Sequence, residues 1–370
     1  MKRVLVIGNG FDLAHGLPTS YADFLNVLKK PNLFKMAIEE AKESTRVNTS
    51  KAPWSKYLMN ASNISCSNIN AMLNYVKNCS WANYFIECNA EINGWVDFEH
   101  EMIPAIQMFQ MALRSSVEIN YFGGRRAAIF KTKNPDMIRM QHLWPLFFEF
   151  HGTSETNGEK EYIIAITENY SDDHYGVLKG KLLDDLYRDF RLFVDAFCTY
   201  LKEMASFEQT KNIELFSRME VTDIITFNYT KTHLKYYSDK RINVYYIHGS
   251  IDDSSSVVMG VNSVENDKKN EFKDYEKSSQ RLLNNVKQKY RDIAENGGYE
   301  LHIFGHSLDE TDKNILKPLI QKSEHTTVYY VHSETRNGDY FKKIKNLTIL
   351  LGRKKAEDML YKELIELEGV

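Results

Sequence analysis

The chain has 370 residues, of which 43% are hydrophobic and 26% charged, and its formal net charge is −3. This balance is typical of a globular protein with one large domain or two, and it excludes a strongly basic surface for nucleic acid or an anionic membrane. No apolar stretch approaches the roughly 20 residues that cross a bilayer, and the initial VLVIG is too short for a signal peptide. We therefore expect a cytoplasmic protein without nucleic-acid or membrane partners.

The cysteines do not indicate a metal site. Their positions are 66, 79, 88 and 198, so none forms a C-x-x-C pair. This spacing excludes a structural zinc site built from two such pairs, and a disulfide framework is not expected in a chain of this size. We predict no metal.

Short apolar runs rich in Val, Ile and Tyr recur along the chain. Several are apolar at consecutive positions, which is typical of parallel strands covered by helices on both faces. These runs span residues 2–8, 161–167, 221–229, 243–249, 256–261, 300–308, 326–333 and 347–352.

Helical patterns lie between these runs. Residues 177–206 place apolar side chains three and four positions apart, which predicts an amphipathic helix about 45 Å long. A shorter helix is predicted over 20–30, with Thr19 or Ser20 as its N-cap. Further helices are predicted over 275–296, ended by two glycines, and over 310–321, where Pro318 would kink or shorten the helix.

The spacing of these elements predicts a divided fold. The first strand and helix are separated from the main group of strands by a long segment that is largely helical in pattern. We predict an α/β protein in which residues 1–30 and 216–370 form a parallel sheet flanked by helices. Residues 31–215 would form a large, mainly helical insertion or cap.

The turn after the first strand has the sequence Gly8-Asn9-Gly10, and a helix follows. A strand, a glycine turn and a helix form the βα layout that binds nucleotide phosphates with backbone N–H groups. The next glycine is Gly16, so the dinucleotide fingerprint G-x-G-x-x-G is absent. The turn alone is compatible with either a ligand loop or a tight structural turn.

The longer spacing G-N-G-x5-G-L-P resembles the sirtuin loop G-A-G-x5-G-I-P, which wraps NAD and closes over its nicotinamide ribose. Three further segments resemble parts of the sirtuin site in the expected order. TFNYT (226–230) resembles the sirtuin TQNID, YIHGS (246–250) the segment with the catalytic histidine, and FGHSLDETD (304–312) the adenosine-binding turn. Each lies at a strand end, where open α/β sheets bind ligands.

Taken together with WVDFE (95–99), these motifs resemble the AbiH phage abortive-infection family. The resemblance implies a sirtuin-like Rossmann-type sheet that binds NAD. Sirtuin-like domains of anti-phage proteins typically hydrolyse NAD, so the resemblance also implies an NAD glycohydrolase that releases nicotinamide and ADP-ribose. NAD would be its substrate. Such an enzyme would poison its host, so we expect it to be latent until oligomerisation or a phage-derived component activates it.

The resemblance assigns roles to particular residues. Asn228 would position the water or the ribose, and His248 would act as the general base. The phosphates and the nicotinamide ribose would be held by Gly8, Asn9, Gly10, Phe11, Asp12, Pro18 and Thr19. The adenosine side would be held by Gly305, Ser307 and Leu308.

Two departures from the sirtuin pattern concern the reaction. Thr230 replaces the acidic residue of TQNID, and Asp12 replaces a small hydroxyl residue. Asp12 could hydrogen-bond the ribose or stabilise positive charge on the sugar, or it could cap the N–H groups of its own loop. The sirtuin zinc module is missing, which argues against protein deacetylation.

Two other functions stay open from the sequence. The same site could bind NAD or ADP-ribose without cleaving it, as a sensor or interaction module in phage defence. Alternatively, Asp97 and Glu99 could hold a magnesium ion for nuclease chemistry, although with Glu101 they also fit the acidic first turn of a helix.

Overall fold

The computed structural model describes all of the chain except residues 1, 44–62, 89–97, 115–117, 123–124, 134–143, 172–176, 206–211, 239–240, 265–268, 270, 285–289 and 332–337. A six-stranded, entirely parallel sheet has the order β10-β9-β8-β1-β6-β7. Its strands are β1 (Lys2–Ile7), β6 (Asp223–Thr226), β7 (Asn243–Tyr246), β8 (Tyr299–Phe304), β9 (His325–Tyr330) and β10 (Ile365–Gly369). Numbered by their sequence order within this sheet, the strands are arranged 3-2-1-4-5-6.

The central strand β1 is buried on both faces, as its run of consecutive apolar residues predicts. Val4, Leu5, Val6 and Ile7 are all at most 1% exposed. Val4 and Val6 pack in one core with α11 (Tyr290–Asn296), α12 (Lys313–Lys322), α13 (Asp339–Leu351) and α14 (Arg353–Tyr361). Leu5 and Ile7 pack in another with α1 (Asn9–Ala14) and α9 (Glu214–Arg218). Helices therefore cover both faces of the sheet, which makes this part of the chain an α/β unit.

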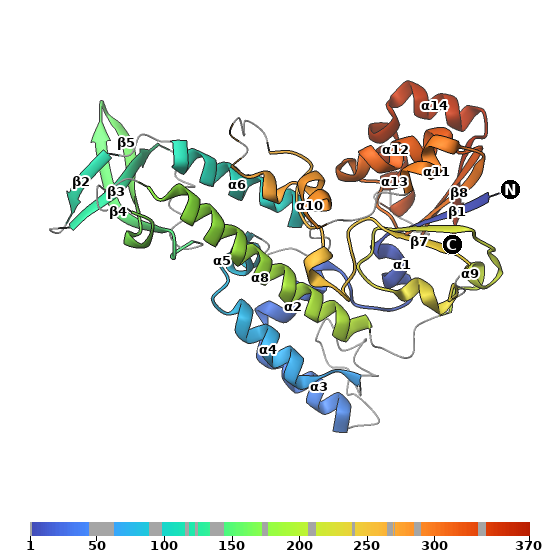
Figure 1. Cartoon of the computed structure of the whole chain (residues 1–370), viewed down its shortest axis with the longest axis horizontal. Coiled ribbons are helices and arrows are strands. Elements are labelled where there is room, and N and C mark those ends of the chain that lie inside the picture. Colours follow the sequence, from blue (N-terminus) through green and yellow to red (C-terminus); the bar gives the residue numbers. More distant parts are fainter. Residues whose placement is uncertain are drawn as a thin grey trace.

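The segment between β1 and β6 contributes most of the remaining helices. The long helix α8 (Lys179–Ala205) confirms the helix predicted over 177–206, and it runs through the middle of the molecule (Figure 1). Its apolar stripe packs against the other helices in a core rich in aromatic rings. Those helices are α2 (Tyr21–Lys29), α3 (Pro31–Glu43), α4 (Cys66–Val76), α5 (Ser80–Cys88) and α6 (Phe98–Arg114). Ser20 caps α2 in a reciprocal capping box with Asp23, as its position predicts.

This segment also contains a second sheet that the sequence analysis did not separate from the first. It is antiparallel, with the order β2-β3-β5-β4, and it lies at the far end of the molecule from the parallel sheet (Figure 1). Its strands are β2 (Glu118–Phe122), β3 (Arg125–Thr132), β4 (Phe148–Thr156) and β5 (Glu159–Ile166). The apolar run 161–167 is thus a strand, but it belongs to this sheet.

Other predicted elements need correction. The run 347–352 lies mostly in helix α13, because a short apolar run fits a buried helical turn as well as a strand. The run 256–261 forms no strand: after a 3-10 turn at Ser254–Ser256 it is buried loop. The described part of 275–296 contains two helices, α10 (Lys277–Leu283) and α11. The sequence analysis missed β10.

The helix predicted over 310–321 starts with a 3-10 turn, η6 (Glu310–Asp312), and continues as α12. Asp309 caps η6 by accepting a hydrogen bond from the Thr311 N–H. Pro318 lies inside α12.

Candidate functional site

The loops after β1 and β8 are in direct backbone contact at the carboxyl edge of the parallel sheet. The Gly8 N–H donates to Phe304 O at 3.1 Å, and the Gly10 N–H donates to Gly305 O at 2.8 Å. A Cβ atom on Gly10 would lie 2.6 Å from Gly305 Cα. Gly10 and Gly305 are therefore explained by the close approach of two backbones, a contact that needs no ligand.

The first polar cluster of the site surrounds Asp12 on α1, and we call it the Asp12 cluster (Asp12, Asn228, Thr230 and Thr232). Thr230 Oγ1 donates to Asp12 Oδ2 at 2.5 Å, and Asn228 Nδ2 donates to Asp12 Oδ1 at 3.1 Å. Thr232 Oγ1 lies 3.3 Å from Thr230 Oγ1. The structure thus brings together two predicted site residues that are 216 positions apart in the chain.

Asp12 is 1% exposed, and its side-chain hydrogen-bond partners Asn228 and Thr230 are uncharged. Burial raises the pKa of the Asp12 carboxyl to about 6, although the hydrogen bonds from Thr230, Thr232 and Asn228 act in the opposite direction. Its hydrogen-bond partners lie in the segment after β6, so Asp12 is not a cap for the N–H groups of its own loop. The Thr230 hydroxyl therefore binds the Asp12 carboxylate.

One polar atom of the Asn228 side chain is not used in the Asp12 cluster. Its Nδ2 donates to Asp12, but its buried Oδ1 has no hydrogen-bond partner among the residues that the structure describes. A buried carbonyl oxygen without a partner is uncommon and costs stability. Such an oxygen is available to accept a hydrogen bond from a bound molecule.

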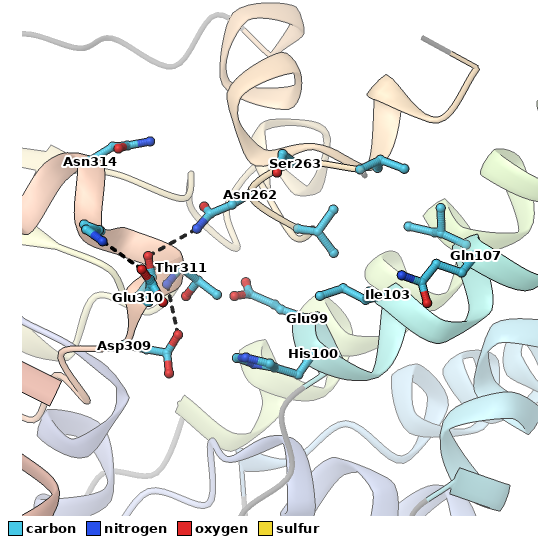
Figure 2. Close-up of a pocket in the computed structure, with 14 residues that line it drawn as sticks. Glu99, His100, Ile103, Gln107, Asn262, Ser263, Asp309, Glu310, Thr311 and Asn314 are labelled. Carbon is cyan, nitrogen blue, oxygen red and sulfur yellow. Dashed lines mark hydrogen bonds and ion pairs between the residues drawn. The ribbon is translucent and has the colours of Figure 1, made fainter. Parts of the chain in front are cut away.

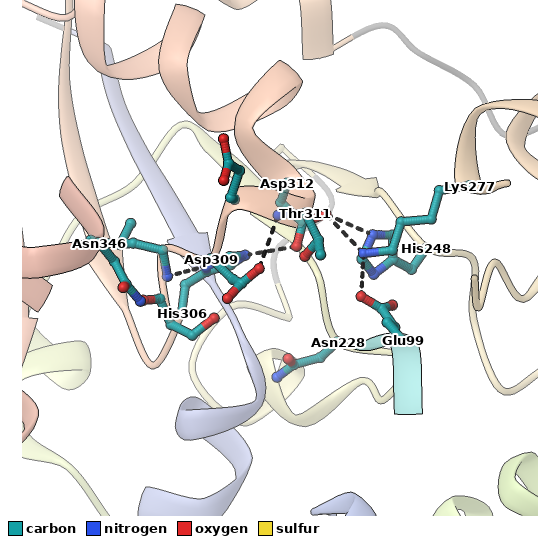
Figure 3. Close-up of polar contacts among 12 residues, drawn as sticks. Glu99, Asn228, His248, Lys277, His306, Asp309, Thr311, Asp312 and Asn346 are labelled. Atoms are coloured by element: carbon teal, nitrogen blue, oxygen red, sulfur yellow. Dashed lines mark hydrogen bonds and ion pairs between the residues drawn. The ribbon is translucent and has the colours of Figure 1, made fainter. Parts of the chain in front are cut away.

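The second polar cluster surrounds Asp312, the last residue of η6 (Figure 3). We call it the Asp312 cluster (Glu99, His248, Lys277, Arg281, His306 and Asp312). Asp312 Oδ1 lies 3.3 Å from His248 Nε2 and 3.3 Å from Lys277 Nζ, and Oδ2 lies 3.6 Å from His306 Nε2. His248 follows β7 and His306 follows β8, so η6 connects loops whose strands are separated by β1 and β6.

Lys277 joins this cluster to the insertion. Its Nζ lies 2.6 Å from Glu99 Oε2 at the start of α6, and its side chain is 1% exposed. Burial works against the charge on Lys277, but Asp312 and Glu99 outweigh it and raise the lysine pKa. Burial also works against the Asp312 carboxylate, yet the charge of Lys277 holds the Asp312 pKa well below its ordinary value. Two carboxylates therefore balance two cations, because Arg281 also lies 3.9 Å from Asp312.

His248 is neutral in this arrangement. Burial lowers its pKa to about 4, even though Asp312 favours the protonated ring. Arg281 Nη2 lies 3.2 Å from His248 Nε2, and a guanidinium can only donate. The Nε2 atom therefore accepts, which places the proton of the neutral ring on Nδ1. If Arg281 withdrew, Nε2–H could donate to Asp312 and Nδ1 could accept a proton from a reactant, as in other Asp–His pairs.

The full sequence matches the family described as Bacteriophage abortive infection AbiH over residues 4–333. The chain belongs to the AbiH family. Among curated proteins, none matches this AbiH chain. In the described part of the chain, no helix combines the length and apolarity needed to cross a membrane.

The remaining predicted residues of the AbiH chain are held by intramolecular contacts. Thr19 Oγ1 donates to Asn9 Oδ1 at 2.7 Å, and Pro18 O accepts from the Tyr200 hydroxyl of α8. Phe11 is buried and packs beside Phe216 in the core.

The turn at residues 305–308, which the sequence analysis predicts to hold the adenosine side, has a strained backbone at Leu308. Leu308 has φ +60°, a left-handed conformation that costs energy for a residue other than glycine. Its N–H donates to His306 Nδ1, and Asn346 Nδ2 donates to Ser307 O. Side chains from the Asp312 cluster and α13 thus hold this turn.

Several members of the Asp312 cluster were missed by the sequence analysis. Lys277, Arg281 and Asp312 received no role, and His306 was noted only for its place in a motif. Asp312 ends the FGHSLDETD segment, which is the one sequence signal that could have found it. Glu99 is explained by its ion pair with Lys277, whereas Asp97 lies outside the described residues. Among the described residues, no group of His, Cys, Asp and Glu has the arrangement of a metal site.

A cavity of about 560 Å³ opens beside the Asp312 cluster (Figure 2). One wall is α6, with Glu99, Ile103 and Gln107, and the others are the loop 261–264 and the start of α12. Asp309, Glu310 and Thr311 complete it, whereas Asn228 and His248 are not among its lining residues. The cavity therefore lies between α6 of the insertion and the η6–α12 segment that follows β8.

Proposed function

We propose that this AbiH protein is an abortive-infection effector that hydrolyses NAD to nicotinamide and ADP-ribose. The observation that carries the proposal is the Asp12 cluster, where the unpartnered Asn228 Oδ1 lies beside a buried carboxylate at the carboxyl edge of the sheet. A ribose hydroxyl could donate to that oxygen. Asp12 could stabilise positive charge that develops on the ribose as nicotinamide leaves.

The strand order supports a sirtuin-like, Rossmann-type assignment. The order 3-2-1-4-5-6 is that of doubly wound dinucleotide-binding folds, in which the ligand binds where the order reverses. That point lies between β1 and β8, whose following loops carry Gly8–Thr19 and Gly305–Leu308. Both predicted binding segments therefore flank the expected crevice.

The proposed reaction breaks the bond between C1′ of the ribose and the pyridinium nitrogen of nicotinamide. Nicotinamide leaves as a neutral molecule, so it needs no protonation. A water molecule forms the new C–O bond at C1′, and His248 takes the proton that this water loses. Asp312 would then stabilise the protonated ring. Asn228 would fix the ribose or the water, and the protonated base would return its proton to solvent.

The buried state of the site supports latency. Asn228 and His248 are each 5% exposed. The hydrogen bond from Arg281 Nη2 also blocks the His248 Nε2 atom. We propose that oligomerisation or a phage-derived component opens the site. The second candidate is a module that binds NAD or ADP-ribose and signals without cleaving it, since Asn228 Oδ1 could accept a hydrogen bond from a ribose that stays intact.

Infection of cells that express the protein separates the two candidates. The proposed hydrolase predicts a fall in cellular NAD within one phage cycle, loss of that fall in Asn228→Ala, and loss of protection with it. Gly180→Ala on α8 is the control, since a Cβ there meets nothing within 4 Å. Protection with unchanged NAD would reject hydrolysis and favour the binding module.

A further inference from the structure

We infer that the cavity between α6 and η6 binds the cationic nicotinamide ring of the dinucleotide, while the ribose attached to it reaches the Asp12 cluster and His248. This inference rests on the proposed function and names the part of the substrate that meets the insertion. At about 560 Å³ the cavity is within the range of small-molecule sites and can hold a nicotinamide ring.

The lining of the cavity suits a flat ring with a carboxamide. Ile103, Ile106 and Val261 provide an aliphatic surface, on which a planar ring can lie. The side-chain amides of Gln107, Asn262 and Asn314 both donate and accept hydrogen bonds, as the nicotinamide carboxamide does. The Asn262 amide already donates to Glu310 O, so its orientation is fixed.

The charge of the cavity selects the oxidised ring. Glu99 is paired with Lys277, and Glu310 is paired with Lys313 at 2.7 Å. Asp309 is a further carboxylate in the lining, and it accepts a hydrogen bond from the uncharged Thr311 N–H. Its negative charge complements the single positive charge of the pyridinium ring. The phosphates would be repelled by the same charge, which directs them toward the glycine turn.

The position of the cavity fits the proposed chemistry. Contacts lead from the lining residue Glu99 to Lys277, from Lys277 to Asp312, and from Asp312 to His248. Thr311, another lining residue, directly precedes Asp312 in η6. A nicotinamide ring in the cavity would therefore have its glycosidic bond on the side of the Asp312 cluster and the proposed base.

The preference of the cavity for a positively charged ring is tested by titrating the full-length protein with two probes. One is a carbocyclic NAD⁺ analogue that cannot be cleaved, and the other is NADH. The first carries the pyridinium charge and the second does not. We expect about tenfold tighter binding of the cation, as one nearby carboxylate can provide. Asp309→Asn should reduce this preference to less than about twofold while it keeps the cap on η6, since Asn is also a good N-cap.

The matched control is Asp253→Asn. Asp253 caps another 3-10 turn, Ser254–Ser256, in the same way and does not line the cavity. This variant should keep the tenfold preference. Equal binding of the two probes to the wild type, or a preference that survives Asp309→Asn, would overturn the inference and leave NAD binding intact. Failure of both probes and of ADP-ribose to bind would instead overturn the proposed function itself.

The shape is tested by filling the cavity. Ile103 is 39% exposed, so Ile103→Trp can be tolerated by the fold, and Met111→Trp on the outside of the same helix is its control. We expect Ile103→Trp to weaken both dinucleotide probes at least fivefold and to leave ADP-ribose, which lacks nicotinamide, unchanged. An equal loss of ADP-ribose binding would place the adenosine end in the cavity and overturn the inference.

Discussion

Asp12 and Asp312 are both buried at the carboxyl edge of the same sheet, yet their pKa values are shifted in opposite directions. Burial among uncharged partners raises the pKa of Asp12 to about 6. The Asp312 carboxyl is also buried, but the charge of Lys277 holds its pKa well below the ordinary value. Burial alone therefore does not decide the charge of a carboxyl group, because the charge of its neighbours does.

This difference suggests different tasks. A carboxyl group whose pKa is near 6 can change its charge when a ligand enters, so Asp12 is suited to respond to a substrate cation. Asp312 stays ionised and holds Lys277 and His306 in place. The Asp12 cluster is therefore the candidate for chemistry, and the Asp312 cluster positions the base and connects it to the insertion.

Removing the Lys277 charge from the Asp312 cluster should have the largest effect on stability. Lys277→Met leaves Glu99 and Asp312 buried without their shared partner, so we expect a loss of about 3–5 kcal/mol in the free energy of unfolding. Chemical denaturation measures this value. Lys231→Met, which breaks an exposed pair with Asp252, should change it little. A Lys277→Met protein as stable as the wild type would show that Asp312 is not held ionised by Lys277.

The next prediction concerns the backbone contact between Gly10, which lies close to Asp12, and Gly305, in the segment that leads to Asp312. Gly10→Ala places a Cβ against the backbone of Gly305, so the loops must separate, and we expect a loss of about 1–3 kcal/mol. Gly180→Ala should instead stabilise the protein by about 0.5–1 kcal/mol, because Gly180 lies in α8 with open space around it. Thermal unfolding distinguishes the two. A neutral Gly10→Ala would mean that the loops are not in contact in solution.

Asp12→Asn should change the pH dependence of stability. The folded-state pKa of Asp12, about 6, exceeds its ordinary value of 3.8, so the folded protein binds this proton first and gains stability as pH falls from 6 to 4. His248 acts in the opposite sense: its folded-state pKa of about 4 makes stability fall as pH falls from 6.5 to 4. Without Asp12 the loss on acidification should steepen by about 1 kcal/mol per pH unit near pH 5. Denaturation midpoints between pH 4 and 7 check this, and unchanged curves would reject a raised Asp12 pKa.

Arg281→Gln should have the smallest effect on stability and a specific effect on His248. Arg281 lowers the His248 pKa and donates to its Nε2 atom, so its removal should raise that pKa and let the ring donate to Asp312. The titration of the His248 ring proton by NMR, assigned with His248→Gln, measures the shift. A lower pKa in Arg281→Gln would contradict this arrangement.

Much of the fold could be predicted from the sequence because local patterns decide it. The strands of the parallel sheet near β1 follow from consecutive apolar residues, and α8 follows from its apolar stripe. The edge strand β10 could not be recognised in the same way, because Ile365–Gly369 is half-exposed and contains charged residues. The apolar run 347–352 is compatible with either a buried strand or a buried helical turn, so only its packing in the core determines that it is helical.

The site was predictable where motifs follow strands, and it was not predictable where distant segments pair. The pairing of Asp12 with Asn228 is compatible with their positions at strand ends, but the hydrogen bond itself depends on the β1–β6 register. Lys277 lies outside every motif, and its role follows only from the approach of α6 and η6. The sequence pattern carries no signal for such an ion pair.

The most direct test of the account is chromatography of the products formed from NAD by the purified protein. Wild type, Asn228→Ala and Gly180→Ala are incubated with NAD, before and after addition of lysate from phage-infected cells that lack the protein. The account predicts that nicotinamide and ADP-ribose appear in equal amounts with wild type and Gly180→Ala, and that Asn228→Ala forms neither. Equal product formation by Asn228→Ala, or intact NAD in all samples despite the lysate, would contradict hydrolysis at this site.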